Sequence, residues 1–249
     1  MNEATQNKVA IVTGSSRGIG ASIAHRLAAD GIAVIVNYAG RTADARAVVD
    51  EIKRQGGRGV AVQADVSIPE QAATLFEQAE KIFGGADILV NNAGIIQPGL
   101  TMLADTDDAL FDRLMAINVK GSFNTMRLAA NRMRDGGRIV NFSSSVKTLG
   151  FAGYSIYAAT KGAVEAMTSI FAKELRGRNI TVNAVAPGPT ATELFLKDKT
   201  PAQVEHLAKM APLERLGTPE DIASVVAFLV SPAAGWVNGQ TLRVNGGIA

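Results

Sequence analysis

Residues Thr13–Gly20 read TGSSRGIG and separate a short β-branched run, Val9–Val12, from an amphipathic stretch, Gly20–Ala29. Glycines at such a junction allow the backbone to turn sharply and to approach a pyrophosphate, which then lies on the N-terminal amide groups of the helix. The spacing is G-x-x-x-G-x-G, whereas G-x-G-x-x-G is the commoner form. A plain strand-to-helix turn would also hold these glycines, but their place after the first strand favours a dinucleotide-binding loop.

The same loop contains GSSRG, Gly14–Gly18, which matches the G-x-S-x-G nucleophile elbow of serine hydrolases. That elbow requires earlier strands and an oxyanion loop before it, and a histidine after it. Only one strand fits before Ser16, and the two histidines are His25, in the following helical stretch, and His206. The hydrolase interpretation is therefore disfavoured.

Short apolar runs alternate with helix-length segments along the whole chain, which predicts a parallel sheet covered by helices on both faces. We expect an α/β, Rossmann-type, doubly wound sheet of seven strands. The expected strands are Val9–Val12, Ala33–Val36, Gly59–Val62, Asp87–Val90, Arg138–Phe142, Ile180–Val185 and Thr241–Val244. The expected helices are Gly20–Ala29, Ala43–Gln55, Pro69–Phe83, Asp107–Met133 and Tyr157–Leu175.

The pattern predicts a single domain over residues 1–249, because no Pro/Ser-rich linker and no repeat interrupts it. The stretch Pro187–Pro212 carries three prolines and lacks strong periodicity. Long stretches of this kind in compact domains are often functional loops, so residues 187–212 are expected to form an irregular substrate lid.

Composition excludes several classes of function. The chain has 249 residues, a net charge of +2 and no cysteine, which rules out disulfides, zinc–thiolate sites and thiol nucleophiles. No Lys/Arg-rich run indicates nucleic-acid binding, and no cluster of ligands suggests a metal. The polar segment Met1–Lys8 does not resemble a signal peptide, and the longest apolar run, Ala223–Val230, is too short to span a bilayer. We expect a cytoplasmic protein with no membrane or nucleic-acid partner.

A candidate catalytic group consists of Ser144, Tyr157 and Lys161. Tyr157 and Lys161 are four residues apart, which places a phenol and an ammonium on one face of a helix. A surface lysine beside a half-buried tyrosine would give the same pattern. Ser144, however, follows a predicted strand, and ligands of open α/β sheets bind at the carboxyl ends of strands.

Taken together, the glycine loop, the sequence NNAG at Asn91–Gly94, and Ser144 with Tyr157 and Lys161 resemble the short-chain dehydrogenase/reductase family. The resemblance covers roughly Lys8–Gly247. It also includes Asp65-Val66, Asn118, Pro187-Gly188 and Asn245–Gly247, in the order that is typical of the family.

The resemblance implies an oxidoreductase that interconverts a ketone and a secondary alcohol with NAD(P). Tyr157 would be the general acid in reduction and the base in oxidation. Lys161 would hold the nicotinamide ribose and lower the pKa of the phenol, and Ser144 would hydrogen-bond the substrate oxygen. Asn118 would hold a water that links Lys161 to solvent.

The resemblance also implies a set of cofactor-binding residues. These are Gly14, Ser16, Arg17, Gly18, Ile19 and Gly20 at the phosphates and adenosine ribose, Asn37 at the end of the second strand, Asp65 and Val66 at the adenine, Asn92 with Ala93 and Gly94 at the centre, Thr190 and Thr192 at the carboxamide, and Tyr157 with Lys161 at the nicotinamide.

The end of the second strand bears on cofactor choice. NAD-preferring relatives usually carry an acid there that binds both ribose hydroxyls, whereas this chain has Asn37. Arg17 and Arg41 could each form a forked pair with a 2′-phosphate, although Arg41 could equally be a solvated charge at a helix start. We therefore expect NADP(H) to be preferred and NAD(H) to be possible.

The substrate is less defined. The sequences VNYAG at Val36–Gly40, Lys173–Leu175 and Ile180–Asn183 resemble 3-oxoacyl-carrier-protein reductases and related ketone and sugar reductases. Arg178 stands where the acyl reductases carry a basic residue for an acidic carrier, although Asp135 weakens such a patch. We expect a small carbonyl or alcohol substrate, with an acyl thioester among the candidates. A sugar or polyol dehydrogenase and a non-enzymatic NAD(P)-binding regulator are the alternatives.

The resemblance further implies a homotetramer. The helical segments Asp107–Met133 and Tyr157–Leu175 carry more apolar residues than one buried face requires. They would form one interface, and the region of the last strand with Asn245–Gly247 would form a second.

Overall fold

The computed structural model describes residues 7–197 and 199–249, so most of the polar segment Met1–Lys8 lies outside the described residues. One seven-stranded sheet with the order β3-β2-β1-β4-β5-β6-β7 forms the centre of the molecule. All neighbouring strands are parallel, which confirms the predicted Rossmann-type α/β fold. The strands are β1 (Val9–Val12), β2 (Ala33–Tyr38), β3 (Gly59–Gln63), β4 (Ala86–Asn91), β5 (Met133–Phe142), β6 (Thr181–Pro187) and β7 (Thr241–Val244).

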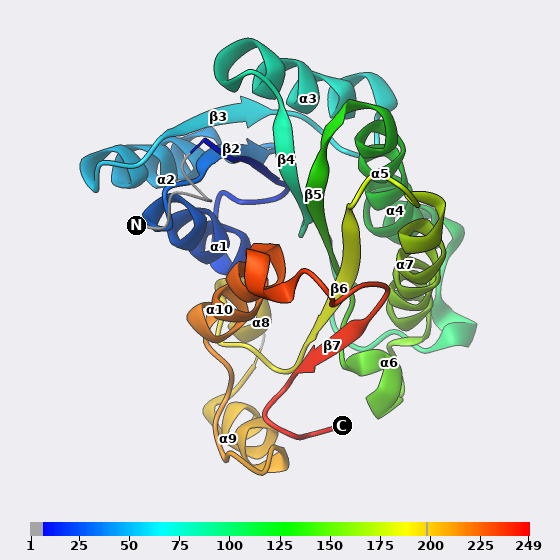
Figure 1. Ribbon diagram of the computed structural model, residues 1–249. Coiled ribbons are helices and arrows are strands. Elements are labelled where there is room, and N and C mark those ends of the chain that lie inside the picture. Colours follow the sequence, from blue (N-terminus) through cyan, green and yellow to red (C-terminus); the bar gives the residue numbers. More distant parts are fainter. Residues whose placement is uncertain (1–6, 198) are drawn as a thin grey trace.

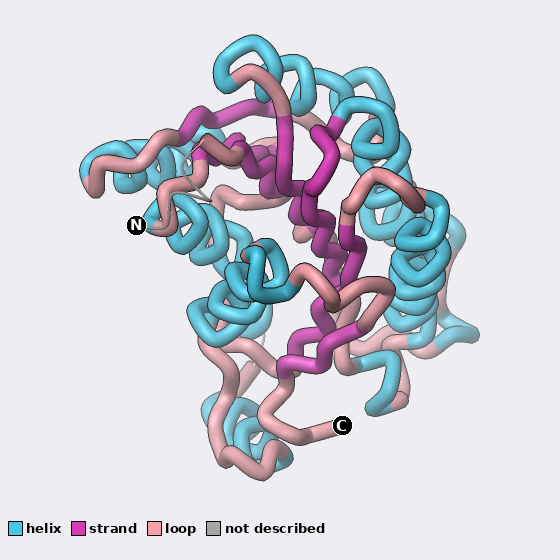
Figure 2. The backbone as a smooth tube through the Cα atoms, in the orientation of Figure 1, coloured by secondary structure: helices cyan, strands magenta, loops and turns pink. Residues whose placement is uncertain are grey.

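Helices cover both faces of this sheet, which runs as a central layer through the molecule (Figures 1 and 2). One face is covered by α1 (Gly18–Ala29), α2 (Thr42–Arg54) and α10 (Pro219–Val230), and the other by α3 (Pro69–Phe83), α4 (Asp108–Leu114), α5 (Gly121–Arg132) and α7 (Ser155–Glu174). Successive side chains of β2 alternate between two apolar clusters: Val34 and Val36 pack with Ile23 of α1, whereas Ile35 packs with Phe76 of α3.

The helix expected at Asp107–Met133 has a different internal structure. The helical path continues from α4 through a π-helical segment, η2 (Met115–Lys120), into α5, and Met133 already belongs to β5. π-helical segments are rare and occur frequently at functional sites. This one contains Asn118, the residue expected to connect Lys161 with solvent.

The expectation that Pro187–Pro212 is irregular is wrong. It contains α8 (Glu193–Leu196) and α9 (Pro201–Met210). Thr200 and Gln203 form a reciprocal capping box, and Pro201 occupies the first turn of α9, where its missing amide hydrogen costs nothing. The same arrangement, with Thr218 and Asp221, begins α10, which was not among the expected helices.

Three short helices complete the structure: η1 (Leu103–Asp105), α6 (Val146–Leu149) and η3 (Pro232–Ala234). The connections that follow the carboxyl ends of β1 to β6 all meet at one edge of the sheet, and this edge holds the candidate site. The strand order reverses between β1 and β4, which is the position where open α/β sheets bind their ligands.

Candidate active site

A large cavity of about 1260 Å³ lies at the carboxyl ends of the strands. Pockets for one drug-sized ligand usually measure ~300–1,000 Å³, so this cavity has room for a cofactor and a substrate together. The sequence-predicted residues on its wall are Gly14, Ser16, Arg17, Gly18, Ile19, Gly20, Asn37, Asp65, Val66, Asn92, Ala93, Gly94, Ser144, Tyr157, Lys161, Thr190 and Thr192. Asn118 is not on the wall, although its neighbour Ile117 is.

The glycine loop is held tightly against the start of the segment that follows β4. Asn92 Nδ2 donates hydrogen bonds to the carbonyl oxygens of Thr13 and Gly14, both at 3.0 Å. A Cβ on Gly20 would lie 2.5 Å from Asn92 Nδ2 and from the Gly14 carbonyl oxygen, so any side chain there would push the loop apart. Gly14 has a φ of 60°, in the left-handed region that favours glycine.

The beginning of α1 fits a pyrophosphate. Arg17 at the N-cap supplies no side-chain hydrogen bond to the first turn, and the first turn carries no acidic residue. The amide groups of this turn therefore face the cavity without a competing carboxylate, and helix N-termini of this kind bind phosphate. The residues present thus fit a dinucleotide cofactor.

The side chain of Asn37, in β2, holds the backbone of the glycine loop in place. Its Oδ1 accepts a hydrogen bond from the Gly14 amide at 3.0 Å, and its Nδ2 donates to the Ala64 carbonyl oxygen at 2.9 Å. The Asn37 side chain is buried, and the oxygen and the nitrogen of its side-chain amide both form hydrogen bonds with backbone atoms. β2 extends to Tyr38, and Asn37 lines the cavity together with the residues that follow it, Tyr38–Arg41.

Ser144 is the serine whose hydroxyl is available beside Tyr157. The hydroxyl of Ser143 donates to Glu165 at 2.6 Å, and that of Ser145 donates to the Ala186 carbonyl oxygen at 3.1 Å. The Ser144 oxygen accepts a long, 3.3 Å hydrogen bond from the Val146 amide and lies within hydrogen-bonding reach of the phenol of Tyr157. These contacts distinguish Ser144 from its neighbours by geometry, where the sequence offered spacing alone.

Tyr157 and Lys161 lie on the first two turns of α7, as their spacing predicts. The Lys161 Nζ donates to the Phe142 carbonyl oxygen at 2.9 Å and lies 5.6 Å from the centre of the Tyr157 ring. Burial lowers the pKa of Lys161 to about 8, because the charged ammonium loses solvation.

Burial has the opposite effect on the phenol. It raises the pKa of Tyr157 to about 12, and the hydrogen bond with Ser144 offsets only part of this rise. In this structure burial is the largest influence on the phenol pKa, and the lowering by Lys161 that the resemblance implies stays a prediction. At neutral pH the phenol keeps its proton, which is the form that a proton donor needs.

Asn118 lies beneath the cavity rather than on its wall. Its Oδ1 accepts from the Ile95 amide at 2.8 Å, and its Nδ2 donates to the Ile95 carbonyl oxygen at 2.9 Å and to the Thr160 hydroxyl at 3.2 Å. A Cβ on Gly94 would lie 3.3 Å from Asn118 Oδ1 and 3.5 Å from Lys161 Nζ. The side chain of Asn118 thus fixes the backbone after Gly94 within a short distance of Lys161.

Sequence reasoning missed the second part of the cavity wall, which is mostly apolar. It includes Leu100, Leu149 and Phe151 together with one face of α9. That face consists of Gln203, His206, Leu207 and Met210, which recur at i, i+3, i+4 and i+7. This helical periodicity was visible in the sequence and could have identified the wall.

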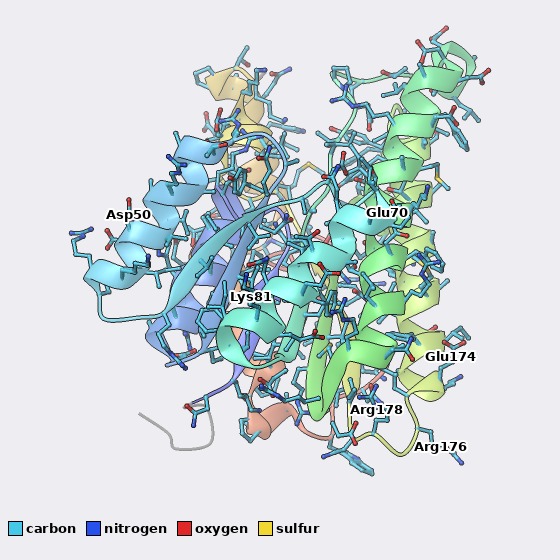
Figure 3. The ribbon with its side chains drawn as sticks, turned by 90° about the horizontal axis from the view of Figure 1, so that it is seen from above. Asp50, Glu70, Lys81, Glu174, Arg176 and Arg178 are labelled. Atoms are coloured by element: carbon cyan, nitrogen blue, oxygen red, sulfur yellow. The ribbon has the colours of Figure 1, made fainter. Side chains whose placement is uncertain are left out.

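Arg178 lies far from this cavity, in the turn that leads from α7 to the amino end of β6 (Figure 3). Its Nε donates to Asp135 at 2.7 Å, and its other nitrogens donate to the carbonyl oxygens of Ala130 and Met133. Its guanidinium is therefore held by its own chain, at the edge of the sheet opposite the site.

In residues 7–197 and 199–249, no set of three or more His, Asp or Glu side chains is placed to hold a metal ion. Within the same part of the chain, no helix is both long and apolar enough to cross a membrane.

The fold and the loop at its switch point define a dinucleotide-binding α/β protein. The family model described as enoyl-(acyl carrier protein) reductase matches residues 14–249. A short-chain type dehydrogenase/reductase from Picea abies is 46% identical, over 96% of this chain and 92% of that protein. An Arabidopsis thaliana protein named NADPH-dependent aldehyde reductase-like, chloroplastic, is 45% identical, over 96% of this chain and 93% of its own length.

A solved structure indicates the same family as these relatives do. A short-chain dehydrogenase from Burkholderia cenocepacia J2315, in complex with NADP, superimposes with a TM-score of 0.92 at 40% identity, covering 98% of both chains. The chain belongs to the short-chain dehydrogenase/reductase family and is an oxidoreductase of that family, as the sequence motifs predicted.

Proposed function

We propose that this protein is an NADPH-dependent reductase of apolar aldehydes or ketones. The observation that carries the proposal is the position of the Tyr157 phenol, which lines the cavity between the glycine loop and an apolar wall and is protonated at neutral pH. A protonated phenol suits the direction of reduction, in which a carbonyl oxygen must gain a proton. The Arabidopsis relative, which is named as an NADPH-dependent aldehyde reductase-like protein, supports the same direction.

The residues have distinct roles in the proposed mechanism. Bound NADPH supplies the hydride that the carbonyl carbon receives. Ser144 donates a hydrogen bond to the carbonyl oxygen and holds it beside the phenol, which transfers its proton to that oxygen. Lys161 binds the ribose of the cofactor with its ammonium, and Asn118 fixes the backbone next to that ammonium.

The apolar wall supports a substrate of low polarity. Leu149, Phe151, Leu207 and Met210 would desolvate an alkyl or aromatic group, whereas a sugar needs many hydrogen-bonding partners. An acyl thioester could enter the same cavity, but Arg178 does not offer a free guanidinium for an acidic carrier. These contacts favour a free carbonyl compound over both alternatives.

Cofactor preference is part of the proposal. The guanidinium groups of Arg17 and Arg41 lie at the cavity wall near the end of β2, where a 2′-phosphate would be bound by forked hydrogen bonds. The solved Burkholderia relative contains NADP. We infer that NADP(H) is preferred, with NAD(H) usable at lower efficiency.

A spectrophotometric screen tests the function directly. NADPH and NADH are each paired with aliphatic and aromatic aldehydes and ketones, with sugars and with 3-oxoacyl thioesters. The proposal expects the highest kcat/KM for an apolar aldehyde or ketone with NADPH. Turnover confined to thioesters or to sugar oxidation would contradict it, and binding of cofactor without any turnover would favour the regulator.

Three further expectations belong with this proposal. Residues 187–212 would act as a lid, since all ten residues of α9 keep part of their surface exposed while one face meets the cavity. A saturating cofactor should slow proteolysis there, and equal cleavage with and without it would contradict the lid.

The cytoplasmic location stays a prediction. The tetramer also stays a prediction, and the exposed apolar side chains of Phe111, Phe123 and Ile170 support it.

A further inference from the structure

One carboxylate lies between the two arginines of the cofactor cavity. Oε2 of Glu193, in α8, lies 2.9 Å from Nη1 of Arg17 and 3.6 Å from Nη1 of Arg41. The three side chains come from the glycine loop, from the N-cap of α2 and from the segment after β6, and all three line the cavity.

The two guanidinium groups differ in their other partners. Arg41 also pairs with Asp44 of α2, at 3.3 Å. For Arg17, Glu193 is the one carboxylate partner in an ion pair among residues 7–197 and 199–249. The Arg17 guanidinium holds the pKa of Glu193 below its usual range, so the carboxylate is ionised at neutral pH.

A phosphate and a carboxylate compete for the same chemistry. Both accept forked hydrogen bonds from a guanidinium, and two anions that share one pair of arginines repel each other. A 2′-phosphate could therefore bind Arg17 and Arg41 fully only if Glu193 left them. An adenosine with a free 2′-hydroxyl carries no such charge and leaves the ion pair in place.

We propose that Glu193 is a specificity-determining residue that competes with the cofactor's 2′-phosphate for Arg17 and Arg41. The proposal rests on the proposed function, because it assumes that these arginines bind the 2′-phosphate of NADP(H). Glu193 thereby weakens binding of the phosphorylated cofactor selectively and narrows the difference in affinity between NADPH and NADH.

The test measures binding without turnover. Isothermal titration calorimetry gives the Kd of adenosine 2′,5′-bisphosphate and of adenosine 5′-monophosphate for the wild type, for Glu193→Gln and for Glu205→Gln. Glu205 is the matched control, because it lies on the neighbouring α9, is similarly exposed and pairs with Lys209 instead of the arginines. Glutamine keeps the size of each side chain and removes one negative charge.

Glu193→Gln should tighten the bisphosphate about threefold to fivefold, the size expected for one solvent-exposed ion pair, and should leave the monophosphate unchanged. The gain should shrink at higher ionic strength, because salt screens exposed charges. Glu205→Gln should change neither ligand. An unchanged or weaker bisphosphate affinity in Glu193→Gln, or an equal change for both ligands, would overturn the proposal.

The affinities of the wild type for the two ligands distinguish a failure of this inference from a failure of the proposed function. If the wild type binds the bisphosphate no tighter than the monophosphate, the proposed 2′-phosphate site is wrong, and the competition falls with it. If the wild type prefers the bisphosphate and Glu193→Gln changes nothing, only the role of Glu193 is wrong. Thermal unfolding of each variant confirms that it is folded.

Discussion

Asn37 Oδ1 accepts a hydrogen bond from the backbone amide of Gly14 at 3.0 Å, which ties the glycine loop to the neighbouring strand. The amide nitrogen of the same side chain donates to the Ala64 carbonyl oxygen. Asn37 therefore connects β2, the glycine loop and Ala64, the residue after β3.

Replacing Asn37 with Asp should damage the site without changing cofactor choice. The carboxylate could still accept from Gly14, but it would lose the donor to Ala64 and be buried against a carbonyl oxygen. We expect a loss of roughly 1–3 kcal/mol in the free energy of unfolding and weaker binding of NADPH and NADH alike. Thermal unfolding and fluorescence titrations measure both, with the exposed Asn131→Asp as the control for charge. A switch of preference to NADH would show that position 37 reads the ribose.

Tyr157→Phe removes only the transferable proton and the hydrogen bond to Ser144. We expect kcat for reduction to fall about a thousandfold, within the range of general acid catalysis, with little change in NADPH affinity or Tm. Tyr154→Phe is the matched control, since its ring lies 6.4 Å from that of Tyr157, and its effect should be much smaller. Wild-type turnover in Tyr157→Phe would disprove the proposed mechanism.

Lys161 should give the reductase a basic limit near pH 8. Its pKa is lowered to about 8 by burial, so the ammonium that would bind the ribose is lost as the pH rises through this value, while the phenol stays protonated. NADPH affinity should therefore decline above about pH 8. In Lys161→Arg, whose charge persists, any remaining affinity should not decline in this range. A flat wild-type profile between pH 7 and 10 would contradict the assignment.

The same group predicts a trend in stability. Between pH 8 and 10.5 the folded protein has released the Lys161 proton, whereas the unfolded chain still binds it, so the contribution of this group to stability rises with pH across that window. Lys161→Met should abolish this contribution and should be most stabilising, relative to the wild type, below pH 8. Thermal unfolding at pH 7 and pH 10 measures the difference. A Lys161→Met variant that is less stable than the wild type at pH 7 would show that the bond to Phe142 outweighs desolvation.

Phe123→Glu tests the proposed assembly. Phe123 lies on α5 with 44% of its surface exposed, and Ile82 on α3 is exposed to 43%. Light scattering should show a tetramer for the wild type and a smaller species for Phe123→Glu, because a buried unpaired carboxylate opposes association. Ile82→Glu lies on a helix outside the expected interface and should remain a tetramer. A monomeric wild type at micromolar concentration would defeat this expectation.

Much of the fold was readable from the sequence because its signals are local. Each expected strand is present, since continuous apolar runs mark strands that are buried on both faces, as in β1 and β2. The motif residues of the loop, Ser144, Tyr157 and Lys161 meet at one cavity because the carboxyl ends of parallel strands share one edge. The prolines of residues 187–212 led to the wrong prediction of an irregular stretch. Pro201 begins α9, because a proline that would break the interior of a helix is favourable in its first turn.

The remaining features depend on contacts between distant parts of the chain. Glu193 and Arg17 are separated by 176 positions, and no periodicity relates them. The direction of the Tyr157 pKa shift follows from its burial, which no spacing in the sequence reveals. The hydrogen bonds of the Asn37 side chain could not be predicted, because β2 continues through Asn37 and Tyr38, beyond the apolar run that marked the strand.

The π-helical segment Met115–Lys120 has a consequence for the phase of the two helices that it joins. A π-type turn accommodates about one residue more than an α-helical turn, and each residue rotates the following side chains by about 100°. The buried side chains of α5, among them Asn124, Met126 and Ala129, therefore point in another direction than they would if α4 continued as a regular α-helix. Deleting one residue between 115 and 120 would restore a regular helix but would turn Phe123 and the buried face of α5 out of alignment. The length of this segment is thus constrained more strictly than the chemical identity of most of its side chains.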